Sequence, residues 1–283
     1  MNKILSQTPH STVKKGIYQS KEAVYKIFNS TDDYKCESNI IKQLSHPKIL
    51  SPLAYIDCES TIVYEYIESI TPAPQLAERV LAQLIETLSY IHSRGIIHRD
   101  VKPSNILIDR HGSVKLIDFG SATFVTNVQE YSGTIHYSSP EMLFNCPYSC
   151  KTDVWSLALV YIEFKAAKQT PPAVSKMEVI SHIFKEFGYP EKNDWPQYFN
   201  SSIGQRLSRP HDVPDACDQT TKKFILRMCP EIDTKLLTLL TMMLRLNPDK
   251  RISSLECKNI IKAHDLSAPL PDAGSPEAVR EPR

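Results

Sequence analysis

One short segment constrains the fold of this chain more than any other. Residues 96–107 read IIHRDVKPSNIL and carry Asp100, Lys102 and Asn105 between apolar pairs of residues. The apolar flanks predict a buried setting, and polar groups are buried only where they have partners. We therefore expect the fold to hold these three side chains together at one site.

A further acidic residue, Asp118, follows thirteen residues after Asn105. The intervening sequence, ILIDRHGSVKLI, predicts a β-hairpin with RHGS as its turn. Such a hairpin brings Asn105 and Asp118 side by side. An amide oxygen and a carboxylate are hard ligands suited to Mg²⁺, which favours oxygen donors alongside phosphate oxygens. The pair therefore predicts a magnesium site.

The two charged residues before Asn105 suit the transfer of a phosphoryl group. Asp100 would lie near enough to accept the proton of an attacking hydroxyl. Lys102 would offset negative charge on the transferred group. The residue types and their spacing thus indicate phosphoryl-transfer chemistry.

The composition argues against two classes of partner. The 283 residues suffice for one large domain or two small ones that share an interface, and 41% of them are hydrophobic. The 33 basic and 32 acidic residues nearly cancel, so no nucleic-acid partner is expected. No apolar run approaches the roughly 18 residues of a membrane span, so no membrane partner is expected either.

Two features bear on the compartment. The opening residues MNKILSQTPH do not read as a signal peptide. The seven cysteines are odd in number and scattered, which is typical of reduced intracellular thiols. We expect an intracellular protein, in the nucleus, the cytoplasm or both.

Hydrophobic periodicity divides the chain into two parts and a tail. The first part contains strand-like runs, GIYQSKEAVYKIF, ILSPLAYID and STIVYEYI, and one helical run, DYKCESNIIKQL. From Gln75 helical spacing dominates, in QLAERVLAQLIETLSYIHSRG and later in TDVWSLALVYIEFKAA, KMEVISHIFKEFG and DTKLLTLLTMMLRL. We expect an α+β fold with a small β-rich N-lobe (1–66), a larger α-helical C-lobe (67–266) and a disordered Pro-rich tail (267–283).

The two polar segments carry a family resemblance. HRDVKPSN, followed by Asp118-Phe119-Gly120, resembles the catalytic and magnesium-binding loops of eukaryotic protein kinases. The other landmarks fall in family order along almost the whole chain. The resemblance implies a two-lobed protein kinase fold, ATP and Mg²⁺ as cofactors, and transfer of the γ-phosphoryl group to Ser or Thr of a protein.

The resemblance also assigns two catalytic positions in the N-lobe. AVYKIF matches the Val-Ala-Ile-Lys strand of the family, so Lys26 would bind the α- and β-phosphates. Glu37 precedes His46-Pro47 by nine residues, as in the cyclin-dependent kinases, and would position Lys26.

Adenine contacts follow from the strand that leads into the hinge between the lobes. IVYEYI resembles that strand, so Glu65 and Ile67 would offer backbone groups to adenine. Four apolar side chains would then enclose the ring: Leu5, Val13, Val24 and Leu107.

Three residues resemble scaffolding positions of the family rather than catalytic ones. Glu141, in SSPEML, stands where the family has Ala-Pro-Glu and should form a buried ion pair with Arg251. Asp153, in DVWSLA, is expected at a helix cap, where it would brace the His98-Arg99 turn.

The phosphate-covering loop departs from the family. The matching stretch is SQTPHSTV, in which Ser6, Thr8 and Ser11 replace the glycines of G-x-G-x-x-G-x-V. Glycine allows a close approach to phosphate and positive φ, and Pro9 removes an N–H donor. We expect weaker or differently arranged phosphate contacts.

The activation segment departs as well. Gln129 stands where many cyclin-dependent kinases carry a phosphorylated Thr, and the adjacent Glu130 could partly substitute for phosphate opposite Arg99. Thr134 fits a Ser/Thr-specific arrangement with Lys102 and Asp100. Ser138 replaces an Arg common in that group, which puts the usual recognition of Pro after the target residue in doubt.

The branch of the family is indicated by later segments. SHIFKEFGYPEKNDWPQY resembles the insert shared by cyclin-dependent, mitogen-activated and glycogen synthase kinases. The missing glycines, the compact N-lobe and SGTIHYSSPEMLF resemble the fungal single-subunit kinases that activate cyclin-dependent kinases. This resemblance implies a cyclin-dependent kinase as the protein substrate. Two alternatives remain open: a divergent cyclin-dependent kinase that requires a cyclin, and a pseudokinase scaffold.

Overall fold

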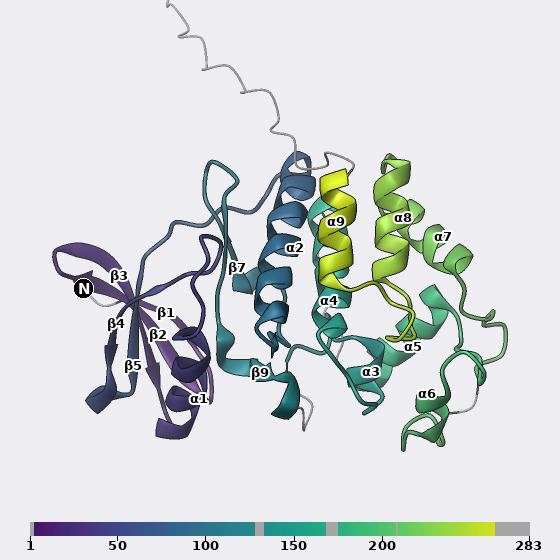
Figure 1. Ribbon diagram of the computed structural model, residues 1–283, viewed down its shortest axis with the longest axis horizontal. Helices are drawn as coiled ribbons and strands as arrows, with labels where there is room; N and C mark the ends of the chain where they lie inside the picture. Colours follow the sequence, from purple (N-terminus) through teal and green to yellow (C-terminus); the bar gives the residue numbers. More distant parts are fainter. Residues whose placement is uncertain (1–2, 128–132, 168–174, 208, 264–283) are drawn as a thin grey trace, which may run out of the picture.

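The protein has two lobes, one built on a β-sheet and one of helices (Figure 1). The computed structural model describes residues 3–127, 133–167, 175–207 and 209–263. The predicted tail, 267–283, lies outside the described residues. The α+β architecture expected from the hydrophobic periodicity is confirmed.

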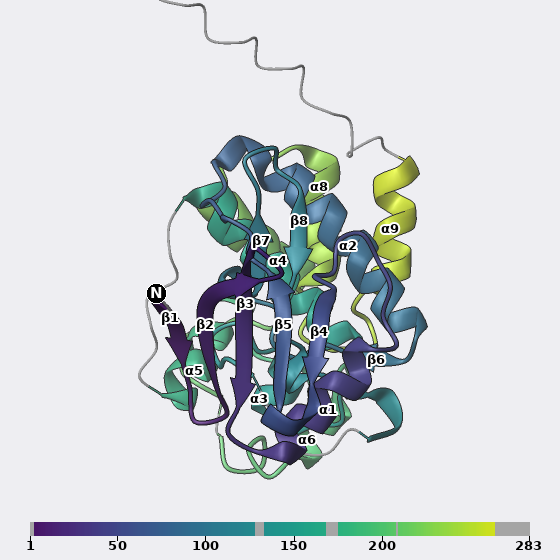
Figure 2. The same cartoon turned by 90° about the vertical axis from the view of Figure 1, so that its left-hand side faces the viewer.

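The small lobe contains a twisted antiparallel sheet, in the order β1-β2-β3-β5-β4 (Figure 2). Its strands are β1 (Lys3–Gln7), β2 (Ser11–Tyr18), β3 (Lys21–Phe28), β4 (Pro52–Ile56) and β5 (Thr61–Glu65). The three predicted strand regions are confirmed. Because β3 and β5 are neighbours at the centre, the strand that carries Lys26 lies beside the strand that leads out of the lobe.

One helix, α1 (Thr31–Ile41), accompanies the sheet. Ser30 caps it by accepting the backbone N–H groups of Asp32 and Asp33 at 3.1 and 3.4 Å. Tyr34 is buried against Phe28, with ring centroids 5.7 Å apart, and its hydroxyl donates to Asp57. The helix is therefore fixed to the sheet one turn before Glu37.

The large lobe is mainly helical. Its helices are α2 (Ala77–Ser93), α3 (Pro140–Leu143), α4 (Lys151–Ala166), α5 (Lys176–Phe187), α6 (Pro196–Asn200), α7 (Asp218–Met228), α8 (Thr234–Met243) and α9 (Ser254–Ala263). In Figure 1, α4 lies behind α2 and α9 and is buried along nearly its whole length. A helix with apolar residues on every side requires such a central place.

Two small sheets join the catalytic segments to this body. β6 (Ile96–Ile97) pairs with β9 (Thr123–Phe124), and β7 (Ile106–Ile108) pairs with β8 (Val114–Leu116). The second pair is the predicted hairpin, which is confirmed. Its turn begins at Asp109, one residue earlier than expected, because this side chain accepts the N–H groups of two later residues.

None of the helices in the described part of the chain combines the length and the apolar character needed to cross a membrane.

Candidate active site

The predicted site residues surround one cavity between the lobes, with a volume of about 620 Å³. Strands β1, β2, β3 and β5 line one side, and residues 100–121 line the other. The twelve side chains predicted for the site all line this cavity: Leu5, Val13, Val24, Lys26, Glu37, Glu65, Ile67, Asp100, Lys102, Asn105, Leu107 and Asp118. Residues separated by most of the chain thus meet in one place.

Three charged side chains form a triad in which Lys26 and Glu37 are buried and Asp118 is open to the cavity. The Nζ of Lys26, on β3, lies 2.5 Å from Glu37 Oε2 on α1 and 2.7 Å from Asp118 Oδ1, which follows β8. Only 8% of Lys26 and 1% of Glu37 is exposed, so water cannot replace these contacts. The ammonium group therefore ties α1 and the segment after β8 to the sheet.

The electrostatics of the triad follow from its composition, one cation and two carboxylates. Burial lowers the pKa of Lys26, but the charges of Glu37 and Asp118 together raise it above its usual value. Burial opposes ionisation of Asp118, but Lys26 and the nearby groups lower its pKa. Burial raises the pKa of Glu37, and the carboxylate of Asp118 adds to this effect, although Lys26 opposes it. Asp118 therefore remains ionised and accessible at the cavity.

Backbone geometry fixes Asp118. Its φ of 63° is in the left-handed region, and its carboxylate accepts the N–H of Gly120 at 3.3 Å. The next residue, Phe119, is buried with its ring 4.9 Å from that of His98. A Cβ at Gly120 would lie 3.1 Å from Glu37 Oε2, so a side chain there would press on the triad. Close packing therefore favours glycine here, since any side chain would force Glu37 or Asp118 to shift.

A second cluster gathers on the large-lobe side of the cavity. Lys102 Nζ lies 2.7 Å from Asp100 Oδ2 and 2.8 Å from the hydroxyl of Thr134. Thr134 also donates its hydroxyl and its backbone N–H to Asp100 Oδ1, at 2.8 and 2.9 Å. The contact between Thr134 and the two charged residues agrees with the arrangement expected from the sequence. Asp100 is thus held by contacts on both carboxylate oxygens.

Asn105 joins this cluster to the hairpin. Its buried side-chain amide donates to Asp100 Oδ2 and to the Asp100 carbonyl, both at 2.9 Å. Its own carbonyl accepts the N–H of Ile117, the residue before Asp118, at 3.0 Å. The hairpin therefore links the two predicted metal ligands through the backbone. Because the amide nitrogen is bonded to Asp100, the amide oxygen is the atom left for a cation.

The donor set fits a magnesium ion bound together with phosphate. No group of three or more His, Cys, Asp and Glu residues suited to a metal occurs among the described residues. Mg²⁺ is usually bound by one or two protein oxygens, with phosphate and water supplying the rest. Asn105 and Asp118 provide that number.

The opposite end of the cavity is apolar. Val24, Ile67 and Leu107 line it and also pack against the core of the small lobe. Sequence reasoning missed Tyr64 and Ile117, which line the cavity nearby. The continuous apolar run of β5, in which Thr61 to Tyr64 are all buried, is the signal that could have identified Tyr64 as an inward-facing residue. These side chains give this part of the cavity an apolar lining suited to an aromatic ring.

A buried carboxylate holds the backbone of the catalytic loop. Asp153 accepts the N–H groups of His98 and Arg99, each at 2.8 Å, and pairs with His92 Nε2 at 2.8 Å. The predicted cap position is wrong, because α4 has Cys150 at its N-cap and Asp153 lies in the first turn. The predicted bracing of the loop is confirmed.

Asp153 gives a testable pH dependence. Burial opposes its ionisation, but the bonds from His92 and His98 lower its pKa below 3.8. A carboxylate whose pKa is lower in the folded than in the unfolded chain stabilises the fold at pH values above its unfolded pKa. This stabilisation is lost as the pH falls through the pKa of the folded chain. We expect Asp153→Asn to lower the free energy of unfolding at pH 7, with a smaller difference from wild type near pH 3. Urea denaturation at both pH values measures this. The exposed Asp212→Asn is the control, and a difference that is independent of pH would contradict the expectation.

Arg99 has partners that the sequence did not suggest. Its guanidinium donates to the carbonyl of Ser121 at 2.5 Å and to the hydroxyl of Tyr148 at 3.0 Å. Gln129 and Glu130, which were expected opposite Arg99, lie outside the described residues. Nothing in the sequence around Tyr148 marks it as a partner of a residue so far away.

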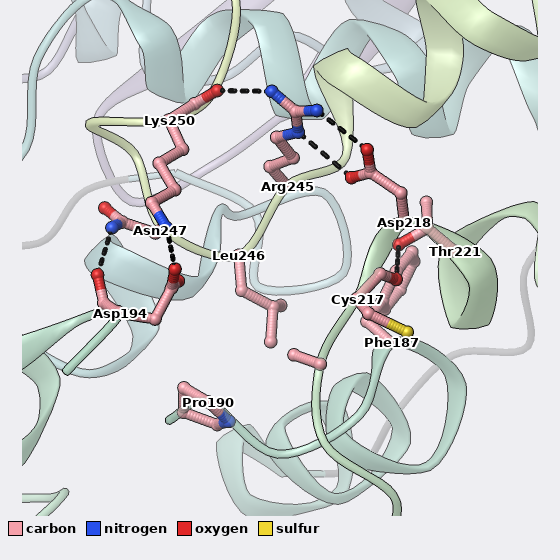
Figure 3. Close-up of a pocket in the computed structure, with 11 residues that line it drawn as sticks. Phe187, Pro190, Asp194, Cys217, Asp218, Thr221, Arg245, Leu246, Asn247 and Lys250 are labelled. Atoms are coloured by element: carbon pink, nitrogen blue, oxygen red, sulfur yellow. Dashed lines mark hydrogen bonds and ion pairs between the residues drawn. The ribbon is translucent and has the colours of Figure 1, made fainter. Parts of the chain in front are cut away.

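A second cavity, of about 290 Å³, lies in the large lobe between α5, α7 and the segment after α8 (Figure 3). Its two basic side chains are both paired with acids. Arg245 bonds to both carboxylate oxygens of Asp218, and Lys250 pairs with Asp194. An anion entering this cavity would have to displace a carboxylate, so the first cavity is the candidate active site.

Comparison with known protein families agrees with this geometry. The family model described as the protein kinase domain matches residues 4–263 of the chain.

Proposed function

Because the chain belongs to the protein kinase family, we propose that it transfers the γ-phosphoryl group of MgATP to a Ser or Thr of a protein. The finer part of the proposal is that it acts as a kinase that activates cyclin-dependent kinases without a cyclin of its own. The proposal rests on one observation. Asp100 forms an ion pair with Lys102 and accepts the hydroxyl of Thr134, across the cavity from Lys26 and Glu37.

The reaction needs a base and a cation at the substrate hydroxyl. Asp100 orients the hydroxyl and accepts its proton, while the hydroxyl oxygen forms a bond to the γ-phosphorus. The bond between this phosphorus and the β–γ bridging oxygen breaks, and ADP leaves with the electron pair. Lys102, 2.7 Å from Asp100, stabilises the negative charge on the transferred group.

The other predicted residues bind the nucleotide in this proposal. Lys26 binds the α- and β-phosphates, and Glu37 holds Lys26 in place. Asn105 and Asp118 would hold Mg²⁺, which would offset the charge of the phosphate oxygens. The six remaining predicted residues surround adenine. Glu65 and Ile67 contribute backbone groups, and four apolar side chains enclose the ring: Leu5, Val13, Val24 and Leu107.

The position of α1 supports activity without a cyclin. Tyr34 anchors this helix to Phe28 and Asp57 of its own chain, and the ion pair of Lys26 with Glu37 is formed at 2.5 Å. A cyclin bound against α1 would therefore find the Lys26–Glu37 ion pair already formed. The missing glycines and the compact N-lobe, which resemble the single-subunit activating kinases, support the same substrate class.

The test is phosphate transfer by the purified chain alone. The substrate is a cyclin-dependent kinase with an unphosphorylated activation-loop Thr, and Asp100→Asn is the control. Incorporation at that Thr, lost in the control, is the expected result, because only the wild-type residue can accept the proton. Incorporation only after a cyclin is added would favour the divergent cyclin-dependent kinase.

A non-catalytic scaffold is the second candidate. The backbone N–H groups of the turn between β1 and β2 favour it, because they are bonded within the turn and not offered to phosphate. Absence of phosphate transfer with and without cyclin would make the scaffold the leading interpretation. A rise in melting temperature with MgATP would then separate a nucleotide-binding scaffold from one that binds none.

A further inference from the structure

The turn between β1 and β2, residues Thr8–Ser11, covers one end of the nucleotide cavity. Thr8, His10 and Ser11 line the cavity together with Lys26 and Asp118. These residues occupy the place where the family resemblance predicts phosphate contacts from the backbone. Their hydrogen bonds therefore decide what the turn can offer to a nucleotide.

Each backbone N–H of this fully described turn already has a partner inside the turn. The Thr8 N–H donates to the Ser11 carbonyl at 2.9 Å. The N–H groups of His10 and Ser11 donate to the Thr8 hydroxyl at 3.3 and 3.1 Å. Pro9 has no N–H to donate. The backbone N–H groups of the turn are thus bonded within the turn. They do not form the row of free N–H groups that binds anions in glycine-rich loops.

The carbonyl groups of Thr8, Pro9 and His10 are contacted by one residue outside the turn, Asn29. The Asn29 side-chain amide donates to the Pro9 carbonyl at 2.8 Å and lies 3.5 Å from the Thr8 carbonyl. The Asn29 backbone N–H donates to the His10 carbonyl at 2.9 Å. Asn29 directly follows β3, the strand that carries Lys26, and it does not itself line the cavity.

We propose that Asn29 is a positioning residue for nucleotide binding, which holds the turn over the phosphate end of the cavity. In a glycine-rich loop, bonds to the phosphates order the loop when the nucleotide arrives. In this chain the bonds from Asn29 order the turn before the nucleotide arrives. The entropy cost of ordering the turn therefore does not weaken nucleotide binding. A further contact, between His10 Nδ1 and Asp33 Oδ2 at 3.1 Å, fixes the tip of the turn to α1. The inference rests on the proposed function only in taking MgATP as the ligand.

Replacement of Asn29 by Ala tests this role. The variant loses the side-chain bonds to the turn and keeps the backbone bond. Since each such bond contributes about 1 kcal/mol, we expect the Kd and the KM for MgATP to rise about tenfold. The kcat at saturating MgATP should stay within about twofold of wild type, because Asn29 touches no reacting atom. The matched control is Asn39→Ala, an exposed position of α1, which should change neither constant.

A second variant separates positioning from loss of volume. Asn29→Asp keeps the shape of the side chain but removes the donor, so its Kd should rise at least as much as that of Asn29→Ala. An unchanged Kd in both variants would overturn the inference. A fall in kcat at constant KM would also overturn it, because that pattern belongs to a change in the chemical step. Without nucleotide, the melting temperature of Asn29→Ala should lie no more than a few degrees below that of Asn39→Ala, which is the shift that loss of these bonds explains. A larger fall would assign the effect to general destabilisation and overturn the inference.

Failure of the proposed function is distinguishable from failure of this inference. A wild-type chain that binds MgATP without phosphate transfer would contradict the proposed function, while the Kd values would still test Asn29. A wild-type chain that binds no MgATP would contradict both.

Discussion

Replacement of Asp118 by Asn should lower kcat by about three orders of magnitude and leave the fold intact. Phosphoryl transfer depends on charge stabilisation, and loss of one such group typically reduces the rate 10²- to 10³-fold. Asp118 contacts Lys26 at 2.7 Å and is a proposed magnesium ligand, so two stabilising interactions change together. Steady-state kinetics with saturating MgATP measures the effect.

The same variant should lose only a little thermal stability. Lys26 lowers the pKa of Asp118, so the ionised carboxylate stabilises the fold at pH 7, but its side chain is 42% exposed and the contribution is small. Lys26 keeps its buried partner Glu37 in the variant, so the melting temperature should fall by no more than a few degrees. The exposed Asp212→Asn serves as the control for both measurements. Wild-type turnover by Asp118→Asn would exclude the proposed magnesium site.

Replacement of Arg251 by Leu should destabilise the large lobe by about 3–5 kcal/mol. Arg251 bonds to both carboxylate oxygens of Glu141, at 2.6 and 2.8 Å, and both side chains are buried. Without the guanidinium, Glu141 would be a buried charge with no cation, which is strongly unfavourable. The free energy of unfolding from urea denaturation measures the loss.

Two further variants identify the cause. The double variant Glu141→Leu, Arg251→Leu should be more stable than Arg251→Leu alone, because it removes the unpaired charge. Arg209→Leu breaks an ion pair with Asp215 in which both side chains are about half exposed. It should change the free energy of unfolding by less than about 1 kcal/mol. Equal losses in Arg251→Leu and Arg209→Leu would contradict the role of burial.

The parts of the site that could be predicted from the sequence share a physical feature. Asp100, Lys102 and Asn105 are close in the chain, and a hairpin of fixed length returns the chain to Asp118. Lys26 was identified by the strand motif AVYKIF, and Glu37 by its distance of nine residues from His46-Pro47. The elements β5 and α4 could be predicted from long apolar runs, because both are buried on more than one side.

The contacts that escaped prediction join distant residues of common types. The bond from Asn29 to Pro9 depends on the exact register of β2 and β3, in which Ser11 faces Phe28. A one-residue shift of that register would remove it, and no pattern of hydrophobic residues specifies it. The pairing of Arg99 with Tyr148 depends likewise on how two loops pack, which the sequence does not encode locally.

The bonds from Asp153 to His98 and Arg99 have a consequence for regulation. They attach the catalytic loop to α4, a helix at the centre of the large lobe, so this loop can rearrange only if the core of that lobe opens. The turn between β1 and β2 has no buried attachment of this kind among the described residues, since it is held by exposed groups on Asn29 and Asp33. An inhibitor or regulatory protein would therefore change the activity of this chain most easily by displacing this turn, while the catalytic loop keeps its position.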